Sequence, residues 1–111
     1  MITLEKLKSF GADIETGLSR CLNKEDFYLK MVNMGLSDEH FDSLGSAIVA
    51  GDLDGAFENV HALKGVLGNL SLTPLYEKTC ELTELLRNKT PGDYEGLYKE
   101  IIKMRDELLE K

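Results

Sequence analysis

The sequence predicts an all-α protein, an antiparallel up-down four-helix bundle with one or two additional short N-terminal helices. Apolar residues recur with the 3.6-residue period of a helix, only two prolines interrupt the chain, and runs of β-branched residues are few. The connections between the helical segments are short, which favours antiparallel neighbours. Since 111 residues without an internal repeat or a long linker fit one hydrophobic core, residues 1–111 are expected to form a single domain.

The first third of the chain is expected to form three helical segments. Gly11 and Gly35 follow two of them, and glycine is favoured just after the last turn of a helix. The expected segments are Leu4 to about Phe10 with Thr3 as its N-cap, about Asp13 to Cys21, and Glu25 to Met34.

Four further segments account for the bundle. Ser37 and Asp52 each precede an amphipathic run, as residues that cap helix N-termini do, and Gly51 separates the two runs. Proline is favoured at the first helical position, so Thr73-Pro74 is expected to start the next helix. The expected helices are Ser37 to Gly51, Asp52 to about Leu70, Thr73 to about Asn88 and, after a turn at Thr90–Asp93, Tyr94 to about Leu108.

Composition and charge exclude several classes of function. The net charge of −7 argues against nucleic acid or an anionic membrane as the main partner. No stretch approaches the roughly 18 consecutive apolar residues of a membrane span, and the N-terminal residues lack a signal-peptide hydrophobic region, so we expect a cytoplasmic protein. Cys21 and Cys80 are far apart and have no metal-ligand spacing, which favours two reduced thiols and no metal site.

The segment after Asp52 has two contrasting faces when each residue is advanced by about 100° around a helix. One arc is apolar and is expected to face the core; it holds Ala56, Val60, Leu63, Leu67 and Leu70. Nearly opposite it, within about 100° of one another, lie His61, Lys64, Gly65 and Gly68. The histidine is therefore expected to face solvent in mid-helix, with a cation one turn along and two glycines beside it.

The two glycines are unfavourable for an exposed helix, because each costs roughly 0.5–1 kcal/mol relative to alanine. Folding gains nothing obvious from them, whereas a surface without side chains beside His61 lets another protein approach closely.

The chemistry of phosphoryl transfer fits this face of the helix. Imidazole is a good nucleophile near neutral pH, and phosphoryl transfer needs mainly in-line positioning and charge neutralisation. Lys64 is placed to supply one positive charge to phosphoryl oxygens.

The stretch from His61 to Leu70, HALKGVLGNL, resembles the signature of histidine phosphotransfer (HPt) domains of two-component phosphorelays. The order of elements from Ile14 to the last helix is also similar. The resemblance implies that His61 accepts a phosphoryl group from the aspartate of one receiver domain and passes it to another. It further implies that Lys64 assists the phosphoryl group and that Gly65 and Gly68 clear the docking surface.

The same resemblance implies which partners and cofactors to expect. Response-regulator receiver domains are the expected partners, and a hybrid sensor kinase is a further candidate. The receiver is expected to supply Mg²⁺, so this chain binds no cofactor, has no ATP site and acts as a phosphocarrier and not as a kinase. We expect a monomer, and the starting methionine slightly favours a free-standing protein. Val60 and Ser71 depart from the residues most common in the family.

Three more residues are candidates for the docking surface. Antiparallel pairing through the turn near Ser71 places Thr83 roughly level with His61, and Arg87 follows one turn later. Family members often carry a polar or basic residue about there, which makes Arg87 also a candidate phosphate ligand. Phe57 lies at the edge of the His61 face and is either a core-rim residue or part of an apolar docking patch.

Two other functions compete with the phosphocarrier hypothesis. A non-catalytic bundle that only binds signalling partners would not need a reactive His61. A metal- or cofactor-binding bundle needs several inward-facing His or Glu ligands, and no paired ExxH motifs occur. His40 has no lysine or glycines on its face, and we expect it to be an ordinary solvated helix residue.

Overall fold

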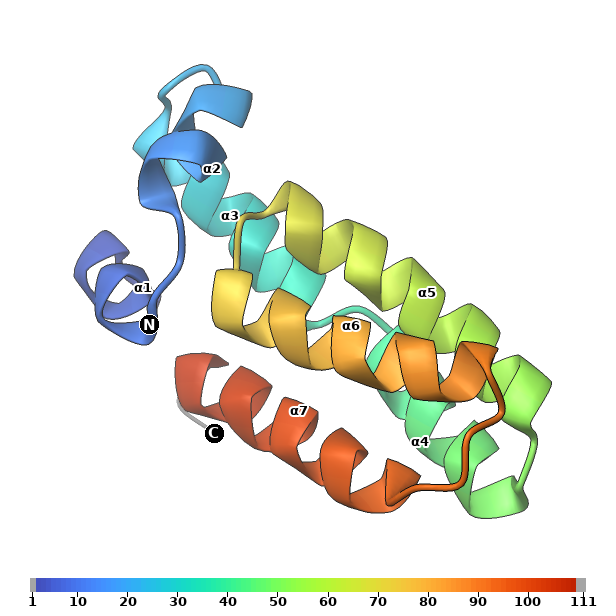
Figure 1. Cartoon of the computed structure of the whole chain (residues 1–111). Coiled ribbons are helices and arrows are strands. Elements are labelled where there is room, and N and C mark those ends of the chain that lie inside the picture. The colour runs from blue at the N-terminus through green and yellow to red at the C-terminus, as the bar shows by residue number, and fades with distance from the viewer. Residues whose placement is uncertain (1, 110–111) are drawn as a thin grey trace.

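The computed structural model describes residues 2–109, and every element within them is an α-helix (Figure 1). This confirms the predicted all-α class. The helices are α1 (Leu4–Phe10), α2 (Ile14–Arg20), α3 (Glu25–Leu36), α4 (His40–Ala50), α5 (Leu53–Asn69), α6 (Thr73–Arg87) and α7 (Tyr94–Leu109).

Helices α4 to α7 form the antiparallel up-down bundle. Figure 1 shows them side by side, and α5 packs against both α4 and α6 while α7 closes the ring against α4 and α6. The two seven-residue helices α1 and α2 are the short N-terminal additions, and α3 leads into α4. The predicted architecture is therefore confirmed.

The hydrophobic core runs the length of the bundle and continues beneath α1 to α3. Side chains from all the bundle helices are buried because each helix presents one apolar stripe inward. The fully buried large side chains are Tyr28, Phe41, Leu7, Leu36, Leu44, Leu63, Leu67, Leu72, Leu75, Leu82, Ile101 and Leu108. Cys21 is buried and Cys80 half-buried, and both are free thiols.

The N-terminal helices are held to the bundle at the turn between α5 and α6. The Tyr28 hydroxyl donates to the carbonyl oxygen of Leu70 at 2.8 Å, and the Asp13 amide donates to Ser71 at 2.9 Å. Burial raises the pKa of Tyr28 to about 12. The tyrosine fits because Gly17 has no side chain, since a Cβ there would lie 2.5 Å from the Tyr28 ring. Tyr28 is thus a core residue.

Several helix ends agree with the capping residues in the sequence. The Thr3 hydroxyl accepts a hydrogen bond from the Lys6 amide, and the Asp52 carboxylate accepts one from the Gly55 amide. Gly11 and Gly51 end α1 and α4 with φ values of 106° and 73°, which are strained for any residue with a side chain.

Other predicted ends are wrong. Gly35 does not stop α3 but lies inside it, where the helix packs so closely on Leu70 that a Cβ would overlap that side chain. Ser37 ends α3, and α4 begins instead at His40, whose amide donates a hydrogen bond to the Asp38 carboxylate at 2.7 Å. At the start of α6, Thr73 is already helical, and Leu72 occupies the N-cap position.

Candidate functional site

Helix α5 places His61 on the outside of the bundle. The apolar arc of this helix is buried as expected, with Ala56, Val60, Leu63 and Leu67 fully inaccessible to solvent. His61 lies on the other side of the helix and is exposed. The apolar periodicity of α5 therefore fixes the direction of the imidazole, because turning His61 inward would turn the whole apolar arc into solvent.

Gly65, one turn after His61, leaves an open surface. A Cβ at Gly65 would meet no described heavy atom within 4 Å beyond its chain neighbours and the backbone of its own helix. Lys64 lies beside it, is half-buried, and makes no ion pair within residues 2–109. Its ammonium group is therefore not paired with any carboxylate in the described part of the chain.

Gly68 differs from Gly65, and part of the prediction for the two glycines is wrong. A Cβ at Gly68 would lie 3.0 Å from Cε1 and 3.2 Å from Cδ1 of Tyr76 in α6. The missing side chain thus admits an aromatic ring of the same chain, and the expectation that folding gains nothing from Gly68 is wrong. The pKa of Tyr76 is raised above its usual value, mainly by a hydrogen bond with the Cys80 side chain.

Phe57 lies next to the histidine, and Arg87 lies next to Phe57. The rings of Phe57 and His61 stack with their centroids 5.7 Å apart and an interplanar angle of 17°. The guanidinium carbon of Arg87 lies 5.7 Å from the centroid of the Phe57 ring, and Arg87 also pairs with Glu84. Phe57 is half-buried against the core, so the structure gives it both a core-rim contact and a contact with the imidazole.

Thr83 does not belong to this surface, and its predicted docking role is wrong. Its side chain is fully buried, and its hydroxyl donates to the carbonyl oxygen of Thr79 at 2.6 Å. A threonine can be buried in a helix in this way because the carbonyl four residues earlier satisfies its hydroxyl. The buried face of α6 therefore includes Thr83 in addition to the leucines.

The sequence patterns did not indicate two further interactions. Arg20 of α2 donates to the carbonyl oxygens of Gly68 and Asn69, at 2.8 and 3.1 Å, and so places a cation at the C-terminal end of α5. His40 is not merely solvated, because its Nδ1 lies 2.6 Å from Oδ1 of Asp38. The His-Asp spacing could have indicated the second contact, whereas no local pattern indicates the first.

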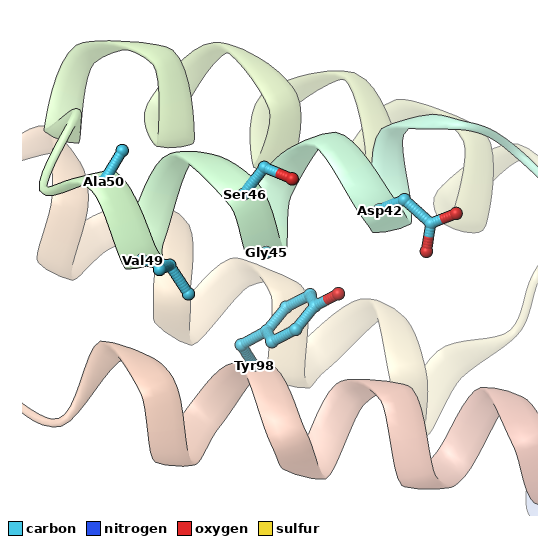
Figure 2. Close-up of a pocket in the computed structure, with 6 residues that line it drawn as sticks. All are labelled: Asp42, Gly45, Ser46, Val49, Ala50 and Tyr98. Carbon is cyan, nitrogen blue, oxygen red and sulfur yellow. The ribbon is translucent and has the colours of Figure 1, made fainter.

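A surface hollow of about 540 Å³ lies elsewhere, between α4 and α7. Figure 2 shows Tyr98 rising from α7 toward Gly45 of α4, where a Cβ would overlap the phenol. The Tyr98 hydroxyl donates to the carbonyl oxygen of Phe41 at 2.9 Å, and burial raises the pKa of Tyr98. No residue of α5 or α6 lines this hollow, so it is separate from the His61 face.

The described residues offer neither a metal-binding cluster nor a membrane span. Within residues 2–109, no three His, Cys, Asp or Glu side chains come together in a way that could hold a metal ion. None of the helices in that range is both long and apolar enough to cross a bilayer.

The fold and the site together define a class, a small helical-bundle domain that exposes one histidine in mid-helix on an open face. A family model described as Hpt domain matches residues 35–111, well over half of the chain. The chain belongs to this family, which confirms the resemblance seen in the sequence. Domains of the family perform histidine phosphotransfer in phosphorelays, interact with receiver domains, and are phosphocarriers and not kinases.

The match begins at the end of α3 and therefore contains the whole four-helix bundle, while α1, α2 and most of α3 precede it. No curated protein and no solved structure matches the chain in the corresponding comparisons.

Proposed function

We propose that this chain accepts a phosphoryl group from the aspartyl phosphate of one receiver domain onto His61 and passes it to the aspartate of another. The observation that carries the proposal is the exposed imidazole in the middle of α5, beside the open surface at Gly65. Transfer between two proteins requires the donor and acceptor atoms to come within bonding reach. A helix face without a side chain next to the nucleophile permits that approach.

The transfer exchanges one bond to phosphorus for another. The lone pair of an unprotonated His61 nitrogen forms a bond to phosphorus while the bond between phosphorus and the aspartate oxygen breaks. The electron pair of that bond returns to the carboxylate, and the imidazole releases one proton to solvent. The same steps in reverse deliver the phosphoryl group to the second receiver.

The remaining residues of the face take supporting roles in the proposal. Lys64 supports the phosphoryl oxygens, since the residue follows His61 by one turn of α5 and its ammonium group has no ion-pair partner in the described chain. Gly65 admits the receiver, and the exposed guanidinium of Arg87 lies at the α6 border of the same surface. Mg²⁺ and the reacting aspartate belong to the receiver, which a response regulator or a hybrid sensor kinase supplies. The carrier acts as a cytoplasmic monomer.

The test is labelling by receiver domains charged with radioactive acetyl phosphate. The wild-type chain is expected to gain acid-labile, base-stable label, as a phosphohistidine does. His61→Gln should lose the label entirely, whereas His40→Gln, the matched control, should keep it. Label that survives in His61→Gln would contradict the assignment. A receiver that binds the wild-type chain tightly without labelling it would instead favour a bundle that works by binding alone.

A further inference from the structure

The imidazole of His61 has an aromatic contact in place of a hydrogen bond. Within residues 2–109, neither of its ring nitrogens makes a hydrogen bond to another residue, and its one ring contact is the stack on Phe57. His40 shows the alternative, since its Nδ1 is held by the Asp38 carboxylate at 2.6 Å. Within the described chain, the stack on Phe57 is therefore the contact that can orient the His61 ring.

The helix geometry explains why Phe57 is the residue beneath the ring. Side chains on an α-helix incline toward its N-terminus, so His61 leans over the residue four positions earlier. Four positions later stands Gly65, which has no side chain to cover the other side. The imidazole is thus supported on one face and open on the other.

Phe57 is itself fixed in place. Its ring packs against the core on one side, and the guanidinium of Arg87 lies over it at 5.7 Å from the ring centroid. Arg87 in turn pairs with Glu84, one turn earlier on α6. The Phe57 ring that stacks on His61 therefore lies at the interface between α5 and α6 and is not a loosely held surface side chain.

We infer that Phe57 is a positioning residue for phosphoryl transfer at His61, an inference that rests on the proposed function. The nitrogen lone pair that attacks phosphorus lies in the plane of the imidazole ring, whereas Phe57 covers a face of that ring. Stacking therefore removes orientations of the side chain without blocking the nucleophilic edge. An imidazole already oriented needs less ordering to reach an in-line arrangement with the phosphoryl donor.

The experiment compares Phe57→Leu with Phe57→Tyr, using phosphoramidate as the phosphoryl donor. In this reaction the P–N bond of phosphoramidate breaks, the new bond forms at His61, and ammonia leaves with the proton that the imidazole gives up. A small donor needs no docking surface, so a contact between Phe57 and a partner protein does not contribute. Phe27→Leu, which changes a half-exposed phenylalanine on α3, is the matched control.

Two measurements are expected to change together. Phe57→Leu should lose the upfield ring-current shift of the His61 ring protons in NMR spectra of the free protein. It should also label about two- to tenfold more slowly, the rate change that corresponds to the strength of one aromatic pair. Phe57→Tyr should restore both, and Phe27→Leu should change neither. A melting curve for each variant shows that the folded fraction is the same.

The possible failures are distinguishable. Unchanged labelling in a Phe57→Leu protein that has lost the ring-current shift would overturn the inference and leave the proposed function intact. Equal slowing in Phe57→Leu and Phe57→Tyr would overturn it as well, because the aromatic ring would then not matter. Failure of the wild-type chain to accept phosphate from either phosphoramidate or charged receivers would refute the proposed function itself.

Discussion

Gly65 and Gly68 are three residues apart on the same face of α5, yet their surroundings differ. A side chain at Gly65 would point into open space, whereas one at Gly68 would press on the ring of Tyr76 at 3.0 Å. Both glycines reduce helix stability through backbone entropy, so each needs a compensating role. For Gly68 the structure supplies that role in the packing of α6 on α5, and for Gly65 it supplies none within the described chain.

The comparison separates two reasons for a glycine that look identical in sequence. A glycine that admits a neighbour of its own chain contributes to the fold, and its replacement should change stability. A glycine that faces solvent beside His61, the proposed nucleophile, has no such role within the described chain, and a role in docking a partner would explain it. Substitutions at Gly65 and Gly68 should therefore affect transfer and stability differently.

Gly65→Gln should impair transfer from a protein donor while leaving the fold intact. The new side chain has room in the free protein and raises helix propensity, but it stands where the receiver would approach. We expect the rate of labelling by a charged receiver to fall by about tenfold or more, equivalent to at least about 1.4 kcal/mol. Labelling by phosphoramidate should stay near the wild-type rate, and Lys99→Gln on the exposed side of α7 serves as the control. An undiminished rate from the receiver would remove Gly65 from the docking surface.

Alanine substitutions should have different effects on stability at the two positions. Gly65→Ala is expected to raise the free energy of unfolding by about 0.5–1 kcal/mol, because alanine is the better helix former and meets no obstacle. Gly68→Ala gains the same propensity but must displace the Tyr76 ring by a few tenths of an ångström, so its unfolding free energy should lie about 1 kcal/mol lower than that of Gly65→Ala. Urea denaturation of both variants measures the difference. Equal stabilisation would show that the Tyr76 ring yields freely.

Much of the fold could be predicted from the sequence because it depends on local patterns. The 3.6-residue period gave the helices and the inward arc of α5, and the side chain of Asp52 and the φ of Gly51 mark the break between α4 and α5 as expected. The exposure of His61 follows from the same periodicity. These features need only residues within one or two turns of each other.

The features that were not predicted arise between helices. Thr83 is buried because the neighbouring helices cover more of α6 than its leucine stripe indicates, and Gly35 lies where α3 packs closely on Leu70. The contact of Arg20 with the end of α5 joins residues 48 positions apart, which no spacing rule detects. For Phe57 the helical wheel left two interpretations open, because a position on a wheel does not tell what a neighbouring helix places over it.

A double-mutant cycle with Tyr76→Leu measures the smallest of the expected effects. If the Tyr76 ring is what opposes a side chain at Gly68, then shortening that residue should relieve part of the strain in Gly68→Ala. The expected coupling free energy is about 0.5 kcal/mol, at the lower end of the range for residues in contact. The same cycle between Tyr76→Leu and Gly65→Ala should give a coupling indistinguishable from zero, since the added methyl group there touches nothing. Equal couplings in the two cycles would mean that Tyr76 acts on the whole exposed face of α5, and the distinction between an internal glycine and a docking glycine would fail.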